Sequence, residues 1–100
     1  MSNWVKLEGD VCAVTGALGG MGVEICREFA RNGANVVMLD LDEEKVKAAA
    51  ADLAAEFGIH AEGYKMNATD EAEVQAAVDA TIADFGRVDV LVNTAGILRF

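Results

Sequence analysis

Three short runs of the chain are apolar at nearly every position. They are residues 11–15, 35–39 and 88–93, and all three are rich in valine or leucine. Strands that are covered on both faces of a sheet have such continuous apolar runs, whereas half-exposed strands alternate between apolar and polar residues. The runs therefore predict buried strands of a parallel sheet. A fourth segment, residues 59–66, mixes charged with apolar residues and predicts a more exposed strand at a sheet edge.

Between these runs, apolar residues recur every three or four positions, which predicts three amphipathic helices. The periodic positions are Ile25, Cys26, Phe29 and Ala30 in the first helix, Val46, Ala49, Ala50, Leu53 and Phe57 in the second, and Val74, Ala77, Val78, Ile82 and Phe85 in the third. A glycine follows each pattern and predicts a left-handed helix end; these glycines are Gly33, Gly58 and Gly86. Asp42 predicts the N-cap of the second helix, and Asp70 with Glu73 predicts a capping pair on the third.

The predicted elements alternate as strand, helix, strand, helix, strand, helix and strand. Parallel strands joined by helical crossovers have right-handed connections, and the simplest spatial order of these four strands is 3-2-1-4. We therefore predict an α/β fold, with a parallel sheet and helices on both faces. In this order residues 88–93 form an open apolar edge, which favours aggregation. We expect further polypeptide to cover that edge.

Composition and charge restrict the partners of the protein. The chain has 100 residues with 8 basic and 17 acidic side chains, a net charge of −9, and its length allows one domain at most. Nucleic acids and anionic membranes are bound by clustered basic residues, so we expect neither as a partner. No apolar run approaches the roughly 20 residues that span a bilayer, and we expect a cytoplasmic protein. Cys12 and Cys26 form no CxxC motif or zinc-ligand set, and we expect both to be buried small hydrophobes.

A glycine-rich segment joins the first predicted strand to the first predicted helix, and residues 15–22 read TGALGGMG. Gly16 would allow a tight turn, Gly20 would let a pyrophosphate approach the backbone, and Gly22 would let helix and strand pack closely. The helix N-terminus would add amide donors and a positive dipole. The segment therefore predicts a phosphate-binding turn. The alternative is a glycine turn without a ligand. In that case the conformational entropy that the glycines lose on folding would not be offset by ligand binding.

Polar or small residues also follow the other three strands. Asp40 ends the second strand, NATD at 67–70 follows the third, and NTAG at 93–96 ends the fourth. The carboxyl ends of strands in such a sheet lie along one rim, where ligands bind. Together with the glycine turn they predict one dinucleotide site and no metal site. The predicted cofactor-binding residues are Gly16, Leu18, Gly19, Gly20, Met21, Gly22, Asp40, Leu41, Asn67, Ala68, Asn93, Ala95 and Gly96.

The spacing of these glycines is GxxxGxG rather than GxGxxG, and with the preceding threonine it resembles the short-chain dehydrogenase/reductase family. The resemblance covers residues 7–97 and includes Asp40, the segment 67–70, GRVDVLV at 86–92 and NTAG at 93–96. It implies a Rossmann-type fold. It also implies an oxidoreductase that transfers a hydride between NAD(H) and an alcohol or ketone.

Asp40 bears on the choice between NAD and NADP. It follows the glycine turn at close to the roughly 20-residue offset of the carboxylate that binds the adenosine ribose hydroxyls. Its charge would repel the 2′-phosphate of NADP. The neighbours in sequence that could neutralise this phosphate include no basic residue; they are Ala17, Leu18, Leu41 and Asp42. We therefore expect NAD as the cofactor, with NADP disfavoured. The alternative is that Asp40 only caps the second helix.

Two positions depart from the pattern of the resembled family. The family usually has aspartate at position 67, where the carboxylate accepts from the adenine amino group; Asn67 keeps an accepting oxygen without the charge. Alternatively, Asn67 is only a turn residue. The family usually reads NNAG where this chain has Thr94, which keeps a hydroxyl but lacks the amide. The resemblance implies that Asn93 ties strand ends together and that Ala95 and Gly96 leave room for the ribose.

The catalytic residues of the resembled family follow the NAG motif and are a serine, a tyrosine, a lysine and an asparagine. This chain has no serine after Ser2, no tyrosine after Tyr64 and no lysine after Lys65, so we assign no catalytic residue. We expect Tyr64 and His60 to be packing or surface residues. Residues 1–100 are therefore expected to form the N-terminal part of a single NAD(P)-binding Rossmann domain, without the C-terminal catalytic and substrate part.

The expected partners are the dinucleotide and, for the full-length protein, an alcohol or carbonyl substrate and further copies in a homo-oligomer. Two other functions fit the same pattern. One is a non-catalytic nucleotide-sensing or scaffold module on this fold. The other is a SAM-dependent methyltransferase, whose fold also has a glycine turn and an acidic strand end, but the GxxxGxG spacing and the NTAG sequence disfavour it. The sequence leaves the substrate and the direction of the reaction open.

Overall fold

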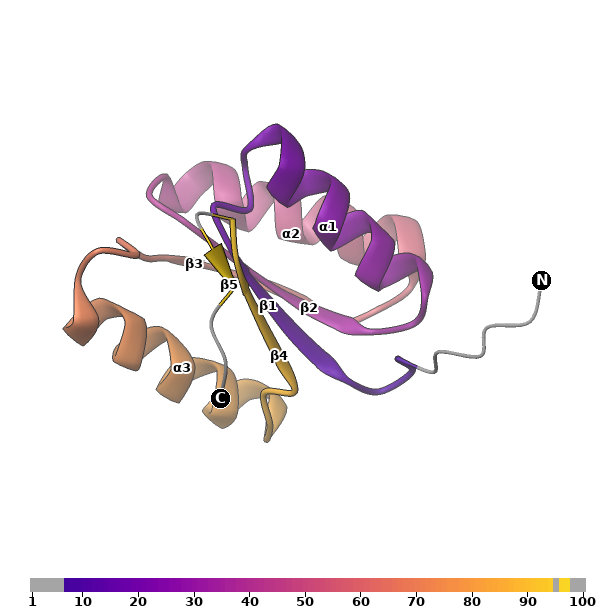
Figure 1. Ribbon diagram of the computed structural model, residues 1–100. Helices are drawn as coiled ribbons and strands as arrows, with labels where there is room; N and C mark the ends of the chain where they lie inside the picture. Colours follow the sequence, from indigo (N-terminus) through magenta and orange to yellow (C-terminus); the bar gives the residue numbers. More distant parts are fainter. Residues whose placement is uncertain (1–6, 95, 98–100) are drawn as a thin grey trace.

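A single twisted sheet runs through the centre of the computed structural model, which describes residues 7–94 and 96–97 (Figure 1). Its strands are β1 (Val11–Thr15), β2 (Asn35–Asp40), β3 (Ala61–Lys65), β4 (Val90–Asn93) and β5 (Gly96–Ile97). Their spatial order is β3-β2-β1-β4-β5. The first four strands are parallel, so the predicted order 3-2-1-4 and the Rossmann-like sheet are confirmed.

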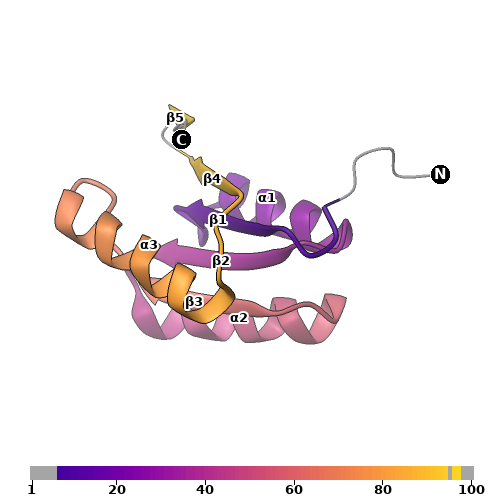
Figure 2. The same cartoon turned by 90° about the horizontal axis from the view of Figure 1, so that it is seen from below.

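Three helices cover the sheet from its two sides. They are α1 (Gly20–Arg31), α2 (Glu43–Phe57) and α3 (Glu71–Phe85). Helices α1 and α2 lie on one face and α3 lies on the other, as the two views show (Figures 1 and 2). Among the described residues, no helix is long and apolar enough to cross a membrane.

Strand β1 is buried along its whole length because it lies between β2 and β4 and has a core on each face. Val14 packs with residues of α1 and α2, whereas Ala13 belongs to the smaller cluster beneath α3. Cys12 and Cys26 are both buried and unpaired, and burial raises the pKa of each thiol to about 12. The two cysteines are therefore the small buried hydrophobes that the sequence predicts.

The predicted helix ends are confirmed. Gly58 and Gly86 end α2 and α3 with φ values of 68° and 83°, and Gly33 follows α1 with φ 86°. Asp42 accepts a hydrogen bond from the Lys45 amide at 3.1 Å and caps α2.

The prediction of a capping pair on the third helix is correct for Asp70 and wrong for Glu73. Asp70 caps α3 as expected, because its carboxylate accepts from the Ala72 and Glu73 amides at 2.9 and 3.3 Å. Glu73 does not return to the Asp70 amide, which donates instead to the Asn67 carbonyl at 3.0 Å. The Glu73 carboxylate accepts from the Asn67 amide at 3.1 Å. The tight turn at 67–70 thus takes the donor that a capping pair needs.

The expected open edge at residues 88–93 also needs correction. Strand β4 begins only at Val90, and the short β5 pairs antiparallel with Val92 and Asn93 at its carboxyl end. At the other end, the Asp89 amide donates to the Val11 carbonyl at 2.9 Å, and the Asp89 carboxylate accepts from the Val11 amide at 2.8 Å. These two bonds turn Asp89 toward β1.

The carboxylate of Asp89 should make stability depend on pH below about 4. The Arg87 guanidinium, 2.6 Å away, and the Val11 amide hold the pKa of Asp89 below its usual value of 3.8. The stabilisation is fully present above the pKa of the unfolded chain and is lost as pH falls through the lower folded-state pKa. We expect Asp89→Asn to lower the urea midpoint by a constant amount above pH 4 and by less at more acidic pH. A difference that does not shrink in acid would contradict this assignment.

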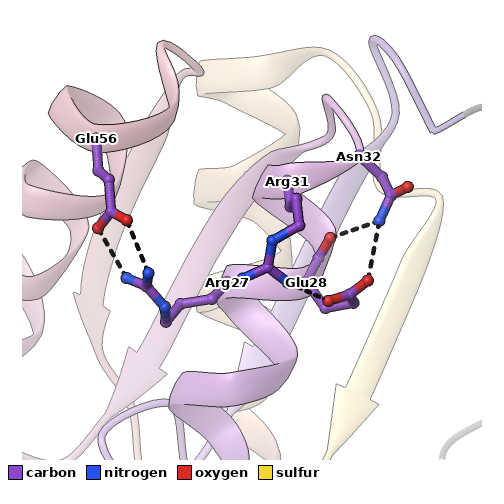
Figure 3. A network of polar contacts seen from close by, with 5 residues as sticks. All are labelled: Arg27, Glu28, Arg31, Asn32 and Glu56. Atoms are coloured by element: carbon purple, nitrogen blue, oxygen red, sulfur yellow. Dashed lines mark hydrogen bonds and ion pairs between the residues drawn. The ribbon is translucent and has the colours of Figure 1, made fainter. Parts of the chain in front are cut away.

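A polar network joins the C-terminal half of α1 to α2 (Figure 3). Arg27 donates to both carboxylate oxygens of Glu56 at 2.7 Å each, and its guanidinium lies 5.2 Å from the centroid of the Phe57 ring. At the end of α1, Glu28 accepts from Arg31 and from the side chain of Asn32, the residue that follows the helix. The pair of Arg27 and Glu56 is the part of this network that joins α1 to α2.

Candidate functional site

The predicted binding segments come together at one end of the sheet. Thr15 is the register partner of both Leu39 and Asn93, and Asp40 is the register partner of Lys65. The loops that follow β1, β2, β3 and β4 therefore lie side by side at the carboxyl ends of the strands (Figure 1). This rim is the position at which open α/β sheets bind ligands.

Two glycines of the turn stand where a side chain would meet strain or overlap. Gly16 has φ 63°, a left-handed conformation, and a Cβ atom on it would overlap the hydroxyl oxygen of Thr94. A Cβ atom on Gly22 would overlap the Gly16 carbonyl oxygen and lie 2.9 Å from the Cα atom of Ala17. Gly22 thus lets α1 pack against the turn itself. Gly20 is different, since no atom lies within 4 Å of the position of its Cβ.

The start of α1 is open to a ligand. Gly19 occupies the N-cap position without a side-chain bond, and no acidic residue stands in the first turn of the helix. The first turns of the other two helices carry acidic residues and an aspartate cap. The amide groups and positive dipole at the start of α1 are therefore not matched by a side chain of the helix itself, which suits an anion.

Asp40 points toward the glycine turn from the end of β2. Its carboxylate accepts from the Leu18 amide at 2.9 Å and from the Leu41 amide at 2.7 Å. Asp42, not Asp40, is the cap of α2. The alternative that Asp40 only caps the second helix is therefore wrong, and its carboxylate lies beside the glycine turn.

Lys65 is a charged neighbour of this site that the sequence argument missed. It pairs in register with Asp40, and register partners of a sheet project to the same face. Its exposed side chain lines a shallow hollow together with Leu41 and the first residues of α2. The neighbours of Asp40 along the chain include no base, whereas strand pairing brings a lysine from β3. The register of that strand was the missing signal.

Asn67 is a turn residue in this structure. Its side-chain oxygen accepts from the amide and the hydroxyl of Thr69, at 3.0 and 2.7 Å. The next residue, Ala68, is exposed at the rim. Two large apolar side chains also stand in solvent beside the rim, Met21 with 68% and Leu41 with 61% of its surface exposed. Exposed apolar groups next to an anion site offer surfaces on which a flat ring can pack.

The NTAG segment reaches the glycine turn through its second residue. Thr94 places its hydroxyl against Gly16, so the residue that departs from the family pattern is in contact with the turn. Asn93 is partly buried and lies across from Thr15. Gly96 begins β5, and Ala95 lies outside the described residues.

The remaining candidates have other partners. The His60 side chain is exposed, with its Nε2 atom 3.0 Å from the Glu62 carboxylate and its ring stacked on Phe85. The Tyr64 hydroxyl bonds to Asp84. Both are packing or surface residues, as expected. Within residues 7–94 and 96–97, no three histidine, cysteine, aspartate or glutamate side chains form a group that could hold a metal.

Comparisons with known proteins agree with this geometry. A family model described as short chain dehydrogenase matches residues 10–100. The D-threitol dehydrogenase of Mycolicibacterium smegmatis is 45% identical over 94 residues, which are 94% of this chain and 36% of that protein.

Two solved structures are similar in fold. A xylitol dehydrogenase with bound NAD⁺ has a TM-score of 0.80 and 36% identity, over 87% of this chain and 33% of its own. The L-sorbose reductase of Gluconobacter frateurii, complexed with NADPH and L-sorbose, has a TM-score of 0.84 and 30% identity, over 92% of this chain and 36% of its own. The chain thus spans about a third of the length of these relatives.

Proposed function

Because this chain belongs to the short-chain dehydrogenase family, we propose that it is the NAD-binding part of an oxidoreductase acting on an alcohol or a ketone. The observation that carries the proposal is the position of Asp40, whose carboxylate lies against the glycine turn at the rim of the sheet. Relatives named for D-threitol, xylitol and L-sorbose support an alcohol or carbonyl substrate. Bound NAD would supply or accept the hydride at its nicotinamide ring.

Each part of the rim has a proposed task. The residues from Gly16 to Gly22 and the start of α1 bind the pyrophosphate, for which Gly20 leaves the backbone accessible. Asp40 accepts hydrogen bonds from the ribose hydroxyls. Leu41, Asn67 and Ala68 border the adenine, and Asn93 and Gly96 border the adenosine ribose. No residue of this chain is assigned a role in proton transfer.

NAD is preferred to NADP in this proposal because the 2′-phosphate would meet the charge of Asp40. Lys65 on the adjacent strand offsets part of that repulsion, so the difference between the affinities for NAD and NADP is reduced but not removed. The solved relatives include complexes with NAD⁺ and with NADPH. The cytoplasmic location and the homo-oligomer remain predictions.

We further propose that these residues are the N-terminal part of a longer dehydrogenase domain. The support is an apolar groove of about 310 Å³ between α3 and the sheet, whose lining includes Ala13, Leu39 and Leu91. Ile82 beside it is 48% exposed, and the hydroxyl of Thr15 in its wall is buried without a partner among the described residues. A further element of the polypeptide packed on this face would cover the groove and could satisfy that hydroxyl.

NADH binding tests the proposed function directly. The purified protein should enhance the fluorescence of NADH at saturation and should not respond to SAM. A protein that binds neither NADH nor NADPH would exclude the proposal.

Asp40→Ala should weaken NADH binding by about 1.5–3 kcal/mol, the range for hydrogen bonds to a charged group. NADPH binding should fall less, because the substitution also removes a repulsive charge, so the ratio of the two affinities shifts toward NADPH. Fluorescence titrations with both cofactors measure this ratio. Asp42→Ala is the matched control, since it removes a neighbouring carboxylate that caps α2, and its ratio should shift much less than that of Asp40→Ala. An unchanged ratio in Asp40→Ala would contradict the assigned role.

A further inference from the structure

The Asp40 carboxylate is engaged by the protein itself before any ligand arrives. One oxygen accepts from the Leu18 amide in the glycine turn and the other accepts from the Leu41 amide that follows β2. The first of these bonds crosses from one strand end to the loop after another. It therefore connects the residue proposed to bind ribose with the loop proposed to bind pyrophosphate.

Ala17 of the glycine turn packs in the core, and two backbone hydrogen bonds add to that packing. The Gly19 amide donates to the Gly16 carbonyl at 3.1 Å, which closes the turn on itself, and the Ala17 amide donates to the Leu39 carbonyl at 3.2 Å. The N-cap residue Gly19 has no side chain that could fix the start of α1. The charge-assisted bond from Leu18 to Asp40 is thus the strongest type of polar bond among these contacts.

A carboxylate can hold the turn and bind the ribose at the same time. Its two oxygens offer about four acceptor positions, and the two amides use two of them. The other two remain for the two hydroxyls of a ribose. An amide side chain in this place has a single accepting oxygen, and its NH₂ group would face one of the amide donors.

We infer that Asp40 is a positioning residue for the phosphate-binding turn, in addition to its role toward ribose; the second of these roles rests on the proposed function. The carboxylate sets the position of the Leu18 amide and with it the path of the backbone from Gly16 to Gly19. Loss of Asp40 therefore weakens the binding of the pyrophosphate, a group that NAD and NADP share.

The first experiment measures the turn without a cofactor. Hydrogen exchange of the Leu18 amide is followed by NMR in the unchanged protein, in Asp40→Ala and in the control Asp42→Ala. Loss of one charge-assisted bond should speed exchange at Leu18 about tenfold in Asp40→Ala, with no change in Asp42→Ala. Equal exchange in all three proteins would overturn the inference, whatever the protein binds.

The second experiment separates the two roles of Asp40 with a ligand that lacks the ribose contact. The probe is an NAD analogue whose adenosine carries neither the 2′- nor the 3′-hydroxyl. A carboxylate that acts only on ribose leaves the affinity for this probe the same in Asp40→Ala and in the unchanged protein. A carboxylate that also holds the turn makes the affinity about tenfold lower in Asp40→Ala. Asp40→Asn is measured in parallel and should also bind the probe more weakly. This second variant allows the test to be decided if Asp40→Ala folds poorly.

The outcomes distinguish this inference from the proposed function. If the unchanged protein does not bind NAD, the proposed function fails, while hydrogen exchange at Leu18 still decides whether Asp40 holds the turn. If it binds NAD and the Asp40 variants lose affinity for NAD but not for the dideoxy probe, the proposed function stands and the positioning role is excluded.

Discussion

Replacing Gly22 by alanine is expected to cost about 3 kcal/mol of folding stability and to abolish dinucleotide binding. The added Cβ atom would overlap the Gly16 carbonyl oxygen and lie 2.9 Å from the Gly16 carbonyl carbon and the Ala17 Cα atom. All three are backbone atoms, so no side chain can rotate away to make room. Either α1 or the turn must move, and both belong to the proposed phosphate site.

The expected loss of folding stability is opposite to what helix propensity alone predicts for this substitution. Gly22 lies in the first turns of α1, where alanine is favoured over glycine by up to about 1 kcal/mol. Its φ is not positive, so alanine meets no backbone strain there. If Gly22→Ala is destabilised, the cause is therefore the overlap of the new Cβ atom with the glycine turn.

Gly20→Ala is the matched control in the same motif. No atom lies within 4 Å of the Cβ position there, so the thermal midpoint should stay the same or rise slightly. Its affinity for NADH should fall, because the methyl group stands where the pyrophosphate is proposed to approach. Denaturation curves and NADH titrations of both variants make the comparison. If Gly22→Ala is as stable as Gly20→Ala, the contact with the turn is not required.

The parts of the fold that the sequence predicts are those fixed by local chemistry. The apolar run of β1 follows from burial on both faces, and Asp42, Gly58 and Gly86 mark helix ends by side-chain or backbone conformation alone. The rim follows because parallel strands end at the same side of a sheet. For this reason the sequence alone predicts that the glycine turn and Asp40 lie together.

Some features that the sequence does not predict depend on contacts between distant segments, and others depend on the local path of the backbone. Lys65 comes beside Asp40 only through the register between β2 and β3, which no pattern along the chain specifies. Strand β5 is two residues long, too short for any hydrophobic period. Glu73 has the spacing of a capping pair with Asp70, but the turn at 67–70 uses the amide that it needs.

Gly63 is the clearest example of such a distant contact, and its replacement by alanine should cost about 3 kcal/mol. In the sequence it is a glycine in a polar edge strand, which usually marks a weak position. In the structure it is buried beneath α2, and a Cβ atom would overlap the Val46 carbonyl oxygen and lie 2.7 and 2.9 Å from the Val46 carbonyl carbon and the Lys47 amide nitrogen. Alanine would push the first half of α2 away from β3.

The expected result for Gly63→Ala is a thermal midpoint about 15 °C lower, since a domain of this size loses roughly 4–8 °C per kcal/mol. NADH affinity, measured well below that midpoint, should change far less than in Gly22→Ala, because the glycine turn lies on β1 and α1 rather than on β3. The two variants thus separate a glycine that supports the sheet from a glycine that shapes the site. Gly20→Ala again serves as the reference for the same substitution in open space. If Gly63→Ala and Gly20→Ala had the same thermal midpoint, α2 could move away from β3 at little cost in free energy.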